Sequence, residues 1–434
     1  MVTLTVFMED LHRLYGVILA KSILSAISIL DDSKSIKQIA DKKVLRYSLH
    51  MNFQFSTAPK IVFGPESASS IPEYAAAMGK NLCLVTGKSP QRIQWIIDAL
   101  QRKIAALHIV PISGEPDTEL IAAHAVEARA KGCDVVVAIG GGSVLDAGKV
   151  IAALIPNTRD VLDYLEVVGK GMPLTEKPLP LIAAPTTSGT GSEVTANAVL
   201  LSAEHKVKVS LRSTEMIPDM AVVDPLLTLS APPAVTASTG LDALTQLMES
   251  FVSRFASPMT DALCREGLKH GAKSMLPAYK NGQNVEARTG MALASLFSGI
   301  TLANAKLGAV HGFAAPLGGE FKAPHGAVCA ALLPHVMEIN IRALKERDPH
   351  NPALTAYDET AQILTADSTA KAADGISWTK NICRKMSIPG LGDIGVTEQD
   401  FKSLAAKAAR ASSMKGNPIE LTEAELLEIL EMAL

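Results

Sequence analysis

The stretch of sequence that decides the fold is Asp134-Val135-Val136-Val137-Ala138-Ile139-Gly140-Gly141-Gly142-Ser143. Its first six residues are mostly apolar and β-branched, which is typical of a strand buried on both faces of a sheet. The glycines that follow allow a phosphate to come close to the backbone, and the helix expected to about Leu154 begins with unpaired N–H groups. A strand, a glycine turn and a helix in this order predict a pyrophosphate site at the turn. A tight structural turn is the alternative, because the spacing matches neither Gly-x-Gly-x-x-Gly nor the P-loop pattern.

The segments around this stretch alternate between strand and helix patterns. Short apolar runs predict strands, and segments with apolar residues at helical spacing predict helices. Their alternation is the rhythm of βαβ units, so we expect a parallel sheet covered by helices. The expected strands are 81–86, 107–112, 134–139, 181–184, 198–202 and 207–211, and the expected helices are 91–103, 118–131 and a third that ends at about 154.

The pattern of the chain changes near Leu229. From Pro232 onward nearly every segment has helical periodicity, so the second half predicts an all-helical domain. The expected fold class is therefore an α/β N-terminal Rossmann-like domain followed by an all-α C-terminal domain. The expected domains are residues 51–229 and 230–434, with residues 1–50 as an N-terminal extension outside the fold, for which a docking helix is the alternative.

Charge and composition exclude several classes of function. The formal net charge is −3 and no run of Lys and Arg stands out, so we expect no nucleic-acid partner. The apolar segment 14–30 is interrupted by Lys21 and Ser22 and is too short to span a bilayer, so we expect no membrane partner. Scattered cysteines without a Cys-x-x-Cys pair predict buried, reduced thiols in a cytoplasmic protein. These cysteines are Cys83, Cys133, Cys264, Cys329 and Cys383.

Two polar loops follow other predicted strands. The loop Thr186-Thr187-Ser188-Gly189-Thr190-Gly191-Ser192-Glu193 carries a density of hydroxyl groups that favours a ligand-facing role over an ordinary solvated loop. Thr86-Gly87-Lys88-Ser89 ends the first predicted strand, where the adenine ribose usually sits in dinucleotide folds. An acidic residue there would bind a ribose hydroxyl and repel a 2′-phosphate. Gly87 therefore leaves room for NADP without excluding NAD.

Four residues in the second half form a candidate metal site. Asp242 and Gln246 are four apart in an expected helix, so both side chains can point at one spot. His311 and His325 follow, each directly before a glycine. One carboxylate and two imidazoles suit a borderline divalent ion such as Fe²⁺ or Zn²⁺, and the amide of Gln246 is a weaker donor. The alternatives are an ion pair or helix cap for Asp242, a buried amide for Gln246 and ordinary core or loop histidines.

Together these motifs resemble those of the iron-containing (group III) alcohol dehydrogenase family. The resemblance covers about Asn52 to the C-terminus and rests on three motifs in the right order. It implies a Rossmann-like domain that binds NAD(P) and a helical domain that binds the metal, an architecture shared with dehydroquinate synthase. It also implies an oxidoreductase that acts on a small alcohol or aldehyde as a homodimer or larger homo-oligomer. The motifs are Gly140-Gly141-Gly142-Ser143-x-x-Asp146, Pro185 to Glu193, and His311-Gly312 through Pro316-Leu317-Gly318-Gly319 to Pro324-His325-Gly326.

The resemblance further implies roles for individual residues. Asp242, His311 and His325 match three metal ligands of the family, and they act in catalysis through the metal, which polarises the substrate oxygen during hydride transfer. Gln246 stands where the family usually has another ligand histidine, and Ala315 stands where many members have a histidine near the nicotinamide. The implied cofactor contacts are Gly87, Ser89, Gly141, Gly142, Ser143, Asp146, Thr186, Thr187, Thr190 and Lys208.

The two departures from the family pattern keep other functions open. With Gln246 in place of a histidine, the same fold could work without a metal, as in the related maleylacetate reductases. A lyase of the dehydroquinate synthase type shares the architecture, but the context Pro324-His325-Gly326 disfavours it. A non-catalytic assembly protein that kept a nucleotide-binding fold is the alternative from another class.

Overall fold

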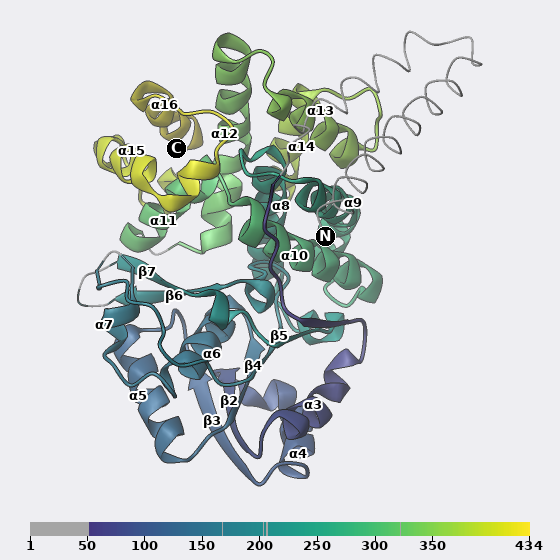
Figure 1. The fold of residues 1–434 in the computed structure, drawn as a ribbon. Coiled ribbons are helices and arrows are strands. Elements are labelled where there is room, and N and C mark those ends of the chain that lie inside the picture. The colour runs from purple at the N-terminus through teal and green to yellow at the C-terminus, as the bar shows by residue number, and fades with distance from the viewer. Residues whose placement is uncertain (1–51, 167, 203, 205–206, 322) are drawn as a thin grey trace, which may run out of the picture. The chain divides into compact units, whose positions relative to one another are not determined.

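A six-stranded parallel sheet forms the centre of the first half of the fold (Figure 1). The structure, a computed structural model, describes residues 52–434 except 167, 203, 205, 206 and 322, so the expected extension of residues 1–50 lies outside the described residues. The strands lie in the order β1 (Lys60–Phe63), β8 (Met220–Val223), β5 (Leu181–Pro185), β4 (Val135–Gly140), β2 (Asn81–Gly87) and β3 (Ala106–Ile112).

Strand β4 lies in the middle of this sheet, as its sequence predicts. All six of its residues are buried. Val137 is aligned with Leu84 of β2 on one side and with Ile182 of β5 on the other. Apolar β-branched residues suit a strand of this kind, because both of its faces are covered and both of its edges are paired.

Helices cover both faces of the sheet. On one face, residues such as Leu84 and Val137 pack in a cluster with the helices α3 (Ile71–Met78) and α4 (Gln94–Gln101). On the other face, Val85 and Ala138 pack in a cluster with α5 and α6. The bounds of these two helices are Thr118–Ala130 and Gly142–Leu154, and the short helix α7 spans Val161–Tyr164. The alternation of side chains along each strand therefore divides the first half into two apolar layers.

The remaining strands of the first half form a separate hairpin. Strands β6 (Asn197–Ser202) and β7 (Val207–Arg212) pair antiparallel, with Leu200 aligned with Val209. All the strands expected from the sequence are present within one or two residues of their predicted bounds. The sequence reasoning missed β1 and β8, which are only four residues long.

Every described element from Pro233 onward is a helix, and these helices form the upper part of the view in Figure 1. One apolar cluster runs through them. The architecture confirms the expected fold class. The boundary predicted near Leu229 stays a prediction, because residues 53–434 form one compact unit. The helices are α8 (Pro233–Val252), α9 (Pro258–Lys280), α10 (Val285–Ala305), α11 (Ala309–Glu320), α12 (His325–Arg347), α13 (Pro352–Thr365), α14 (Ala372–Lys385), α15 (Phe401–Arg410) and α16 (Glu423–Ala433).

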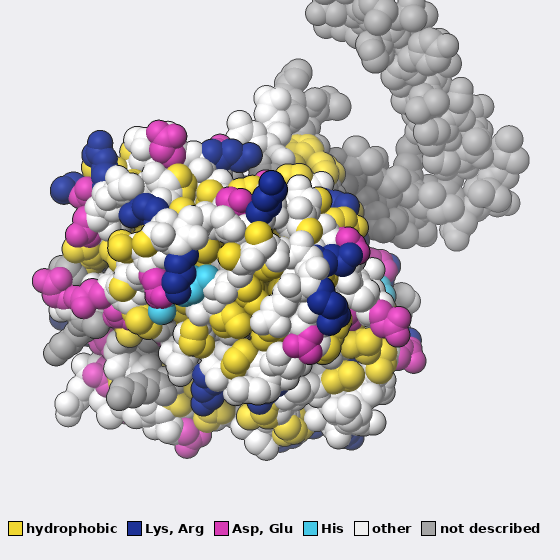
Figure 2. Space-filling model, turned by 90° about the horizontal axis from the view of Figure 1, so that it is seen from below, with side chains coloured by type: hydrophobic (Ala, Val, Ile, Leu, Met, Phe, Trp, Pro, Cys, Tyr) yellow, Lys and Arg dark blue, Asp and Glu magenta, His cyan; other side chains and the backbone are white. Residues whose placement is uncertain are grey.

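Two features bear on the expected absence of membrane and nucleic-acid partners. Helix α12 is long and apolar enough to cross a membrane, but 78% of its apolar window is buried inside this fold, where it acts as a core helix. Figure 2 shows one face of the molecule, on which Lys and Arg side chains lie interspersed with Asp and Glu. This mixture follows from the near-neutral composition and gives that face no field of a single sign.

The loop after β5 is fixed to the helical half by direct contact between two backbones. Gly191 in this loop has a φ of +61° and lies against Gly299 in α10. A Cβ atom added at Gly299 would come within 2.5 Å of the carbonyl oxygen of Gly191. Both positions therefore require glycine, and the contact fixes the polar loop relative to the helices.

The first prediction concerns this contact. Gly299→Ala should lower the free energy of unfolding by roughly 3 kcal/mol, the upper end of the usual cost of overpacking, because the added methyl group meets rigid backbone. Gly319→Ala is the matched control, since Gly319 also lies in a helix but has no atom within 4 Å of the place that an added Cβ would take. Urea denaturation followed by circular dichroism measures both variants. Equal stability of the two variants would show that the backbone contact is not a constraint.

Candidate active site

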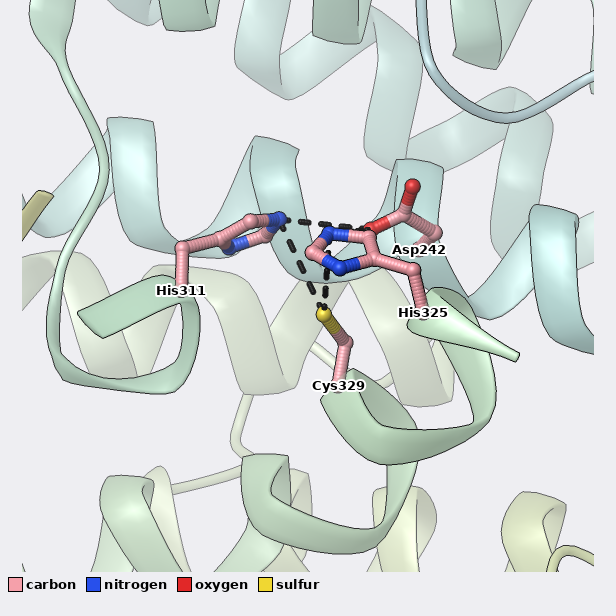
Figure 3. Close-up of side chains that lie close together, drawn as sticks. All are labelled: Asp242, His311, His325 and Cys329. Atoms are coloured by element: carbon pink, nitrogen blue, oxygen red, sulfur yellow. Dashed lines mark hydrogen bonds and ion pairs between the residues drawn. The ribbon is translucent and has the colours of Figure 1, made fainter. Parts of the chain in front are cut away.

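Four side chains of the helical half converge on one point (Figure 3). Asp242 comes from the middle of α8, His311 from the first turn of α11, and His325 and Cys329 from the first two turns of α12. Each offers one ligand atom, and these atoms all lie within 4.8 Å of one another. The structure thus brings together three of the four residues expected from the sequence and adds Cys329, which the sequence reasoning assigned only to buried thiols.

The distances in this cluster are close to those of donors that share one ion. The Oδ1 atom of Asp242 lies 3.3 Å from Nε2 of His311 and 3.9 Å from Nε2 of His325. The Sγ atom of Cys329 lies 3.6 Å from Nε2 of His325 and 3.8 Å from Nε2 of His311. Carboxylate, imidazole and thiolate groups are the donors of zinc and iron sites in proteins, so the residues present fit a divalent metal.

Three of the four side chains in the cluster are closed to solvent. Asp242, His311 and Cys329 are buried, whereas the side chain of His325 is 40% exposed. Gly326 makes the approach of α12 to α8 possible, because a Cβ there would lie 2.1 Å from the carbonyl oxygen of Ser238 in α8. The ligand atoms are therefore reached from the side of His325.

The electrostatics of the cluster favour the ionised forms of Asp242 and Cys329. Burial alone would raise the pKa of Asp242, but the hydrogen bond with His311 and the charge of His325 lower it below its usual value. Burial also opposes ionisation of Cys329, yet the two imidazoles lower the pKa of its thiol. The charge of Cys329 in turn raises the pKa of His325. Burial would lower the pKa of His311, but the charges of Cys329 and Glu249 raise it. A divalent cation held by these residues would take the place of the imidazole protons as the partner of the carboxylate and the thiolate.

Glu249 orients His311 through Nδ1, the ring nitrogen that does not face the cluster. Its Oε2 atom lies 2.6 Å from Nδ1 of His311, and its Oε1 atom accepts a hydrogen bond of 2.7 Å from the N–H of Val310 at the start of α11. A carboxylate at Nδ1 fixes the proton there and leaves Nε2 free as a ligand atom. Glu249 lies seven residues after Asp242 on α8 and therefore on the same helical face, a spacing through which the sequence could have revealed it.

Gln246 contacts Asp242, as the i,i+4 spacing predicts, but through its amide nitrogen. Nε2 of Gln246 donates to Oδ2 of Asp242 over 3.0 Å, and Ser298 Oγ donates to Oε1 of Gln246 over 2.8 Å. An ionised carboxylate only accepts hydrogen bonds, so the contact with Asp242 fixes which end of the amide faces it. Metal ligation by Gln246 stays a prediction. In this structure its amide oxygen accepts a hydrogen bond from Ser298.

A large cleft runs from the cluster along the ends of the sheet strands. Its volume is about 1420 Å³, above the roughly 300–1,000 Å³ of a typical small-ligand pocket, so it has room for a dinucleotide beside a small substrate. Asp242 and His325 line one part of it. The glycine turn at the start of α6 lines another part, and no side chain caps this helix terminus. The expected cofactor contacts that line the cleft are Gly87, Ser89, Gly141, Gly142, Ser143, Thr186, Thr187 and Thr190.

Two expected cofactor contacts, Asp146 and Lys208, do not line the cleft. The carboxylate of Asp146 accepts hydrogen bonds from the Ser192 hydroxyl and the Val199 N–H, and so fixes the loop after β5 to the hairpin. Lys208 forms an ion pair of 3.0 Å with Glu115, which itself lines the cleft. The motif predicted Asp146, and Lys208 was expected as an accessory contact; both roles stay predictions, since Lys208 is paired with a residue at the cleft.

Cys329 could have been found from the sequence. It lies four residues after His325 in a segment with helical periodicity, so both side chains occupy one helical face. The spacings between cysteines do not reveal it, because the five thiols show no metal-binding spacing among themselves and the relevant spacing is from a histidine to a cysteine. Ser298 gave no such signal, since it lies on α10 and meets Gln246 only in the folded chain.

Comparisons with known proteins match nearly the whole described chain. The profile described as iron-containing alcohol dehydrogenase matches residues 58–225, and the profile of the C-terminal part of that family matches residues 236–434. The 1,3-propanediol dehydrogenase of Klebsiella pneumoniae is 35% identical over 380 residues, which are 86% of this chain and 96% of that protein.

Solved structures agree with the sequence matches. The structure of a 1,3-propanediol oxidoreductase superposes with a TM-score of 0.81 and 31% identity, covering 88% of this chain and 100% of that one. The sulfoacetaldehyde reductase of Bifidobacterium kashiwanohense, solved in complex with NAD+, superposes with a TM-score of 0.79 and 30% identity, covering 88% and 99% of the two chains.

The second prediction tests the role of Glu249. Glu249→Gln should weaken Zn²⁺ binding by about 10- to 100-fold, because an amide has one acceptor atom and cannot serve both His311 and Val310. Competition with a chromophoric chelator measures the affinity. Glu338→Gln on α12 is the control, since Glu338 is a half-exposed carboxylate paired with Lys380. Unchanged affinity in Glu249→Gln would remove Glu249 from the site.

Proposed function

The chain belongs to the iron-containing alcohol dehydrogenase family, and from this premise we propose how its own residues perform the chemistry. The protein is an NAD(P)-dependent oxidoreductase that interconverts a small alcohol and its aldehyde or ketone by hydride transfer. We propose that Asp242, His311 and His325 bind the metal. One observation supports this above all: Asp242 and His325 open on the same cleft as the glycine turn of α6 and the threonines after β5.

The chain contributes binding, orientation and exclusion of water. The uncapped start of α6 offers N–H groups to a pyrophosphate, and Thr187 and Thr190 line the cleft beside it. A divalent ion bound at the cluster supplies Lewis-acid polarisation of the substrate oxygen. The buried side of the cluster keeps water away from His311 and Asp242, so the substrate approaches past His325. Because Ala315 cannot carry a proton, we propose that the proton is exchanged with water in the open cleft.

We propose that the enzyme accepts NADP as well as NAD. The end of β2 carries Gly87 where an acidic residue would repel a 2′-phosphate, and Lys88 and Arg92 line the cleft nearby. Glu66 and Glu115 also line the cleft, and the carboxylate of Glu115 is already paired with Lys208. Lys88 and Arg92 can therefore offset the charge of the additional phosphate of NADP.

We also propose that the enzyme works in the cytoplasm as a homo-oligomer. All five cysteines are present as thiols, and four of them are buried, which suits a reducing compartment. Phe255, in the segment before α9, and Met259, in the first turn of α9, leave more than two fifths of their surface exposed and are candidates for a subunit contact. Light scattering after size-exclusion chromatography measures the oligomeric state.

The third prediction tests the function itself. His325→Ala should abolish metal-dependent turnover of short alcohols and aldehydes while cofactor affinity stays nearly unchanged, because His325 lies at the cluster and not at the glycine turn. The absorbance of reduced nicotinamide reports turnover with added Fe²⁺, Zn²⁺ or chelator. His270→Ala is the control, since His270 lies partly exposed on α9 next to Glu266.

Other outcomes of this experiment favour the alternatives. Turnover that persists in chelator and in His325→Ala indicates a metal-free reductase of the same fold. Tight nucleotide binding without turnover of any substrate indicates a non-catalytic assembly protein. Equal loss of turnover and of cofactor affinity in His325→Ala contradicts the proposed division of roles.

The fourth prediction concerns cofactor choice. Gly87→Asp should raise the Kd of NADPH at least tenfold and change that of NADH little, because the new carboxylate repels only the 2′-phosphate; tenfold corresponds to about 1.4 kcal/mol. The backbone tolerates the change, since no atom lies within 4 Å of the Cβ position at Gly87. Fluorescence titration measures both affinities, with Gly319→Asp as a control outside the cleft. An equal effect on NADH and NADPH contradicts the proposal.

A further inference from the structure

We propose that Cys329 is the fourth protein ligand of the metal and that Gln246 orients Asp242 instead of binding the ion. This inference rests on the proposed function of the cluster. It assigns the cluster an oxygen, two nitrogens and a sulfur as donors. The donor that the family pattern places on α8 is thereby supplied from α12.

The distances between donor atoms support a tetrahedral set that includes sulfur. With metal–nitrogen and metal–oxygen bonds of about 2.0–2.1 Å and a metal–sulfur bond of about 2.3 Å, a regular tetrahedron separates nitrogen from oxygen by roughly 3.3 Å and nitrogen from sulfur by roughly 3.6 Å. The observed distances are 3.3 and 3.9 Å for nitrogen to oxygen and 3.6 and 3.8 Å for nitrogen to sulfur. Octahedral neighbours with the same bonds are only about 2.9–3.1 Å apart, so the tetrahedron fits better.

The two oxygens of Asp242 divide their contacts in the way this proposal requires. Oδ1 faces both imidazoles, whereas Oδ2 accepts the hydrogen bond from the amide nitrogen of Gln246. The amide oxygen of Gln246 is in turn bonded to Ser298. Gln246 therefore acts on Asp242 as Glu249 acts on His311, because each fixes a ligand through the atom that does not face the cluster.

Cys329 has no route to the substrate or cofactor other than through the metal. Its side chain is fully buried and does not line the cleft, so it cannot reach substrate or cofactor directly. His325 and Cys329 lie one turn apart on α12, a spacing at which two side chains of one helix bind one ion. The sulfur faces the two imidazoles over distances too long for strong hydrogen bonds.

A thiolate changes which metal the site prefers. Soft thiolate donors favour Zn²⁺, whereas sites of imidazole and carboxylate donors also suit Fe²⁺. With Asp242 and Cys329 both anionic, the ligand charge equals that of a divalent ion. We therefore infer that this enzyme selects Zn²⁺ over Fe²⁺ when both are supplied.

Cobalt substitution tests the sulfur ligand without measuring activity. Zn²⁺ is spectroscopically silent, but Co²⁺ in the same site shows an intense near-ultraviolet charge-transfer band when a thiolate binds it. We expect this band in the wild-type protein at one Co²⁺ per chain. Cys329→Ser should remove the band, and Cys383→Ser, which changes a half-buried thiol of α14, should retain it. Gln246→Ala should also retain the band, because the amide is not a ligand in this proposal.

Metal selection is the second measurement. After dialysis against equal Fe²⁺ and Zn²⁺ under anaerobic conditions, elemental analysis should find mainly zinc in the wild type. Cys329→Ser should lose at least tenfold of this preference, since a hydroxyl is a hard donor. A wild-type preference for iron would contradict the inferred selectivity.

The outcomes separate this inference from the proposed function. Stoichiometric Co²⁺ without the band overturns Cys329 as a ligand and leaves the metal site in place. No Co²⁺ binding to the wild type overturns both. If Cys329→Ser fails to fold, the wild-type spectrum alone decides whether a thiolate binds the metal. Loss of the band in Gln246→Ala but not in Cys329→Ser would reverse the assigned roles.

Discussion

The carboxylate of Asp242 is the constraint on which the site depends. It is buried in the middle of α8, where an unpaired charge would cost several kcal/mol. Three polar groups around it offset that cost: two imidazoles face Oδ1, and the Gln246 amide donates to Oδ2. The burial of this charge therefore requires the first turns of α11 and α12 to lie beside α8.

The same requirement connects the two halves of the fold. The loop after β5 lies against α10 through the backbone contact of Gly191 with Gly299, and Ser298, one residue earlier on α10, bonds the amide of Gln246. The polar loop that lines the cleft and the residues that orient Asp242 therefore share a single turn of α10. A displacement of that turn would move the cofactor side and the metal side together, which keeps the reacting centres in fixed relation.

The sequence predicted what depends on local pattern. The burial of β4, the strands on either side of it in sequence and the change to helices follow from short stretches of sequence, and Asp242 and Gln246 share the spacing of one helical face. What it missed depends on contacts between distant residues. Strand β1 spans four residues and becomes a strand by pairing with β8, and Ser298, which contacts the amide oxygen of Gln246, comes from another helix. The cofactor contacts expected of Asp146 and Lys208 stay predictions, and in this structure their side chains contact Val199 and Glu115.

Gln246 and Cys329 are best understood together. Glutamine has nearly the volume of histidine, so Gln246 fills the space on α8 and keeps a donor directed at Asp242 while giving up the role of ligand. The sulfur on α12 is placed by the same turn that places His325, so no helix has to move to admit it. Neither change alone preserves the site: glutamine without cysteine leaves three donors, and cysteine beside a ligand histidine would place a fifth donor around a small ion. In the proposed assignment the pair keeps four protein donors and adds one negative charge, which favours a softer metal.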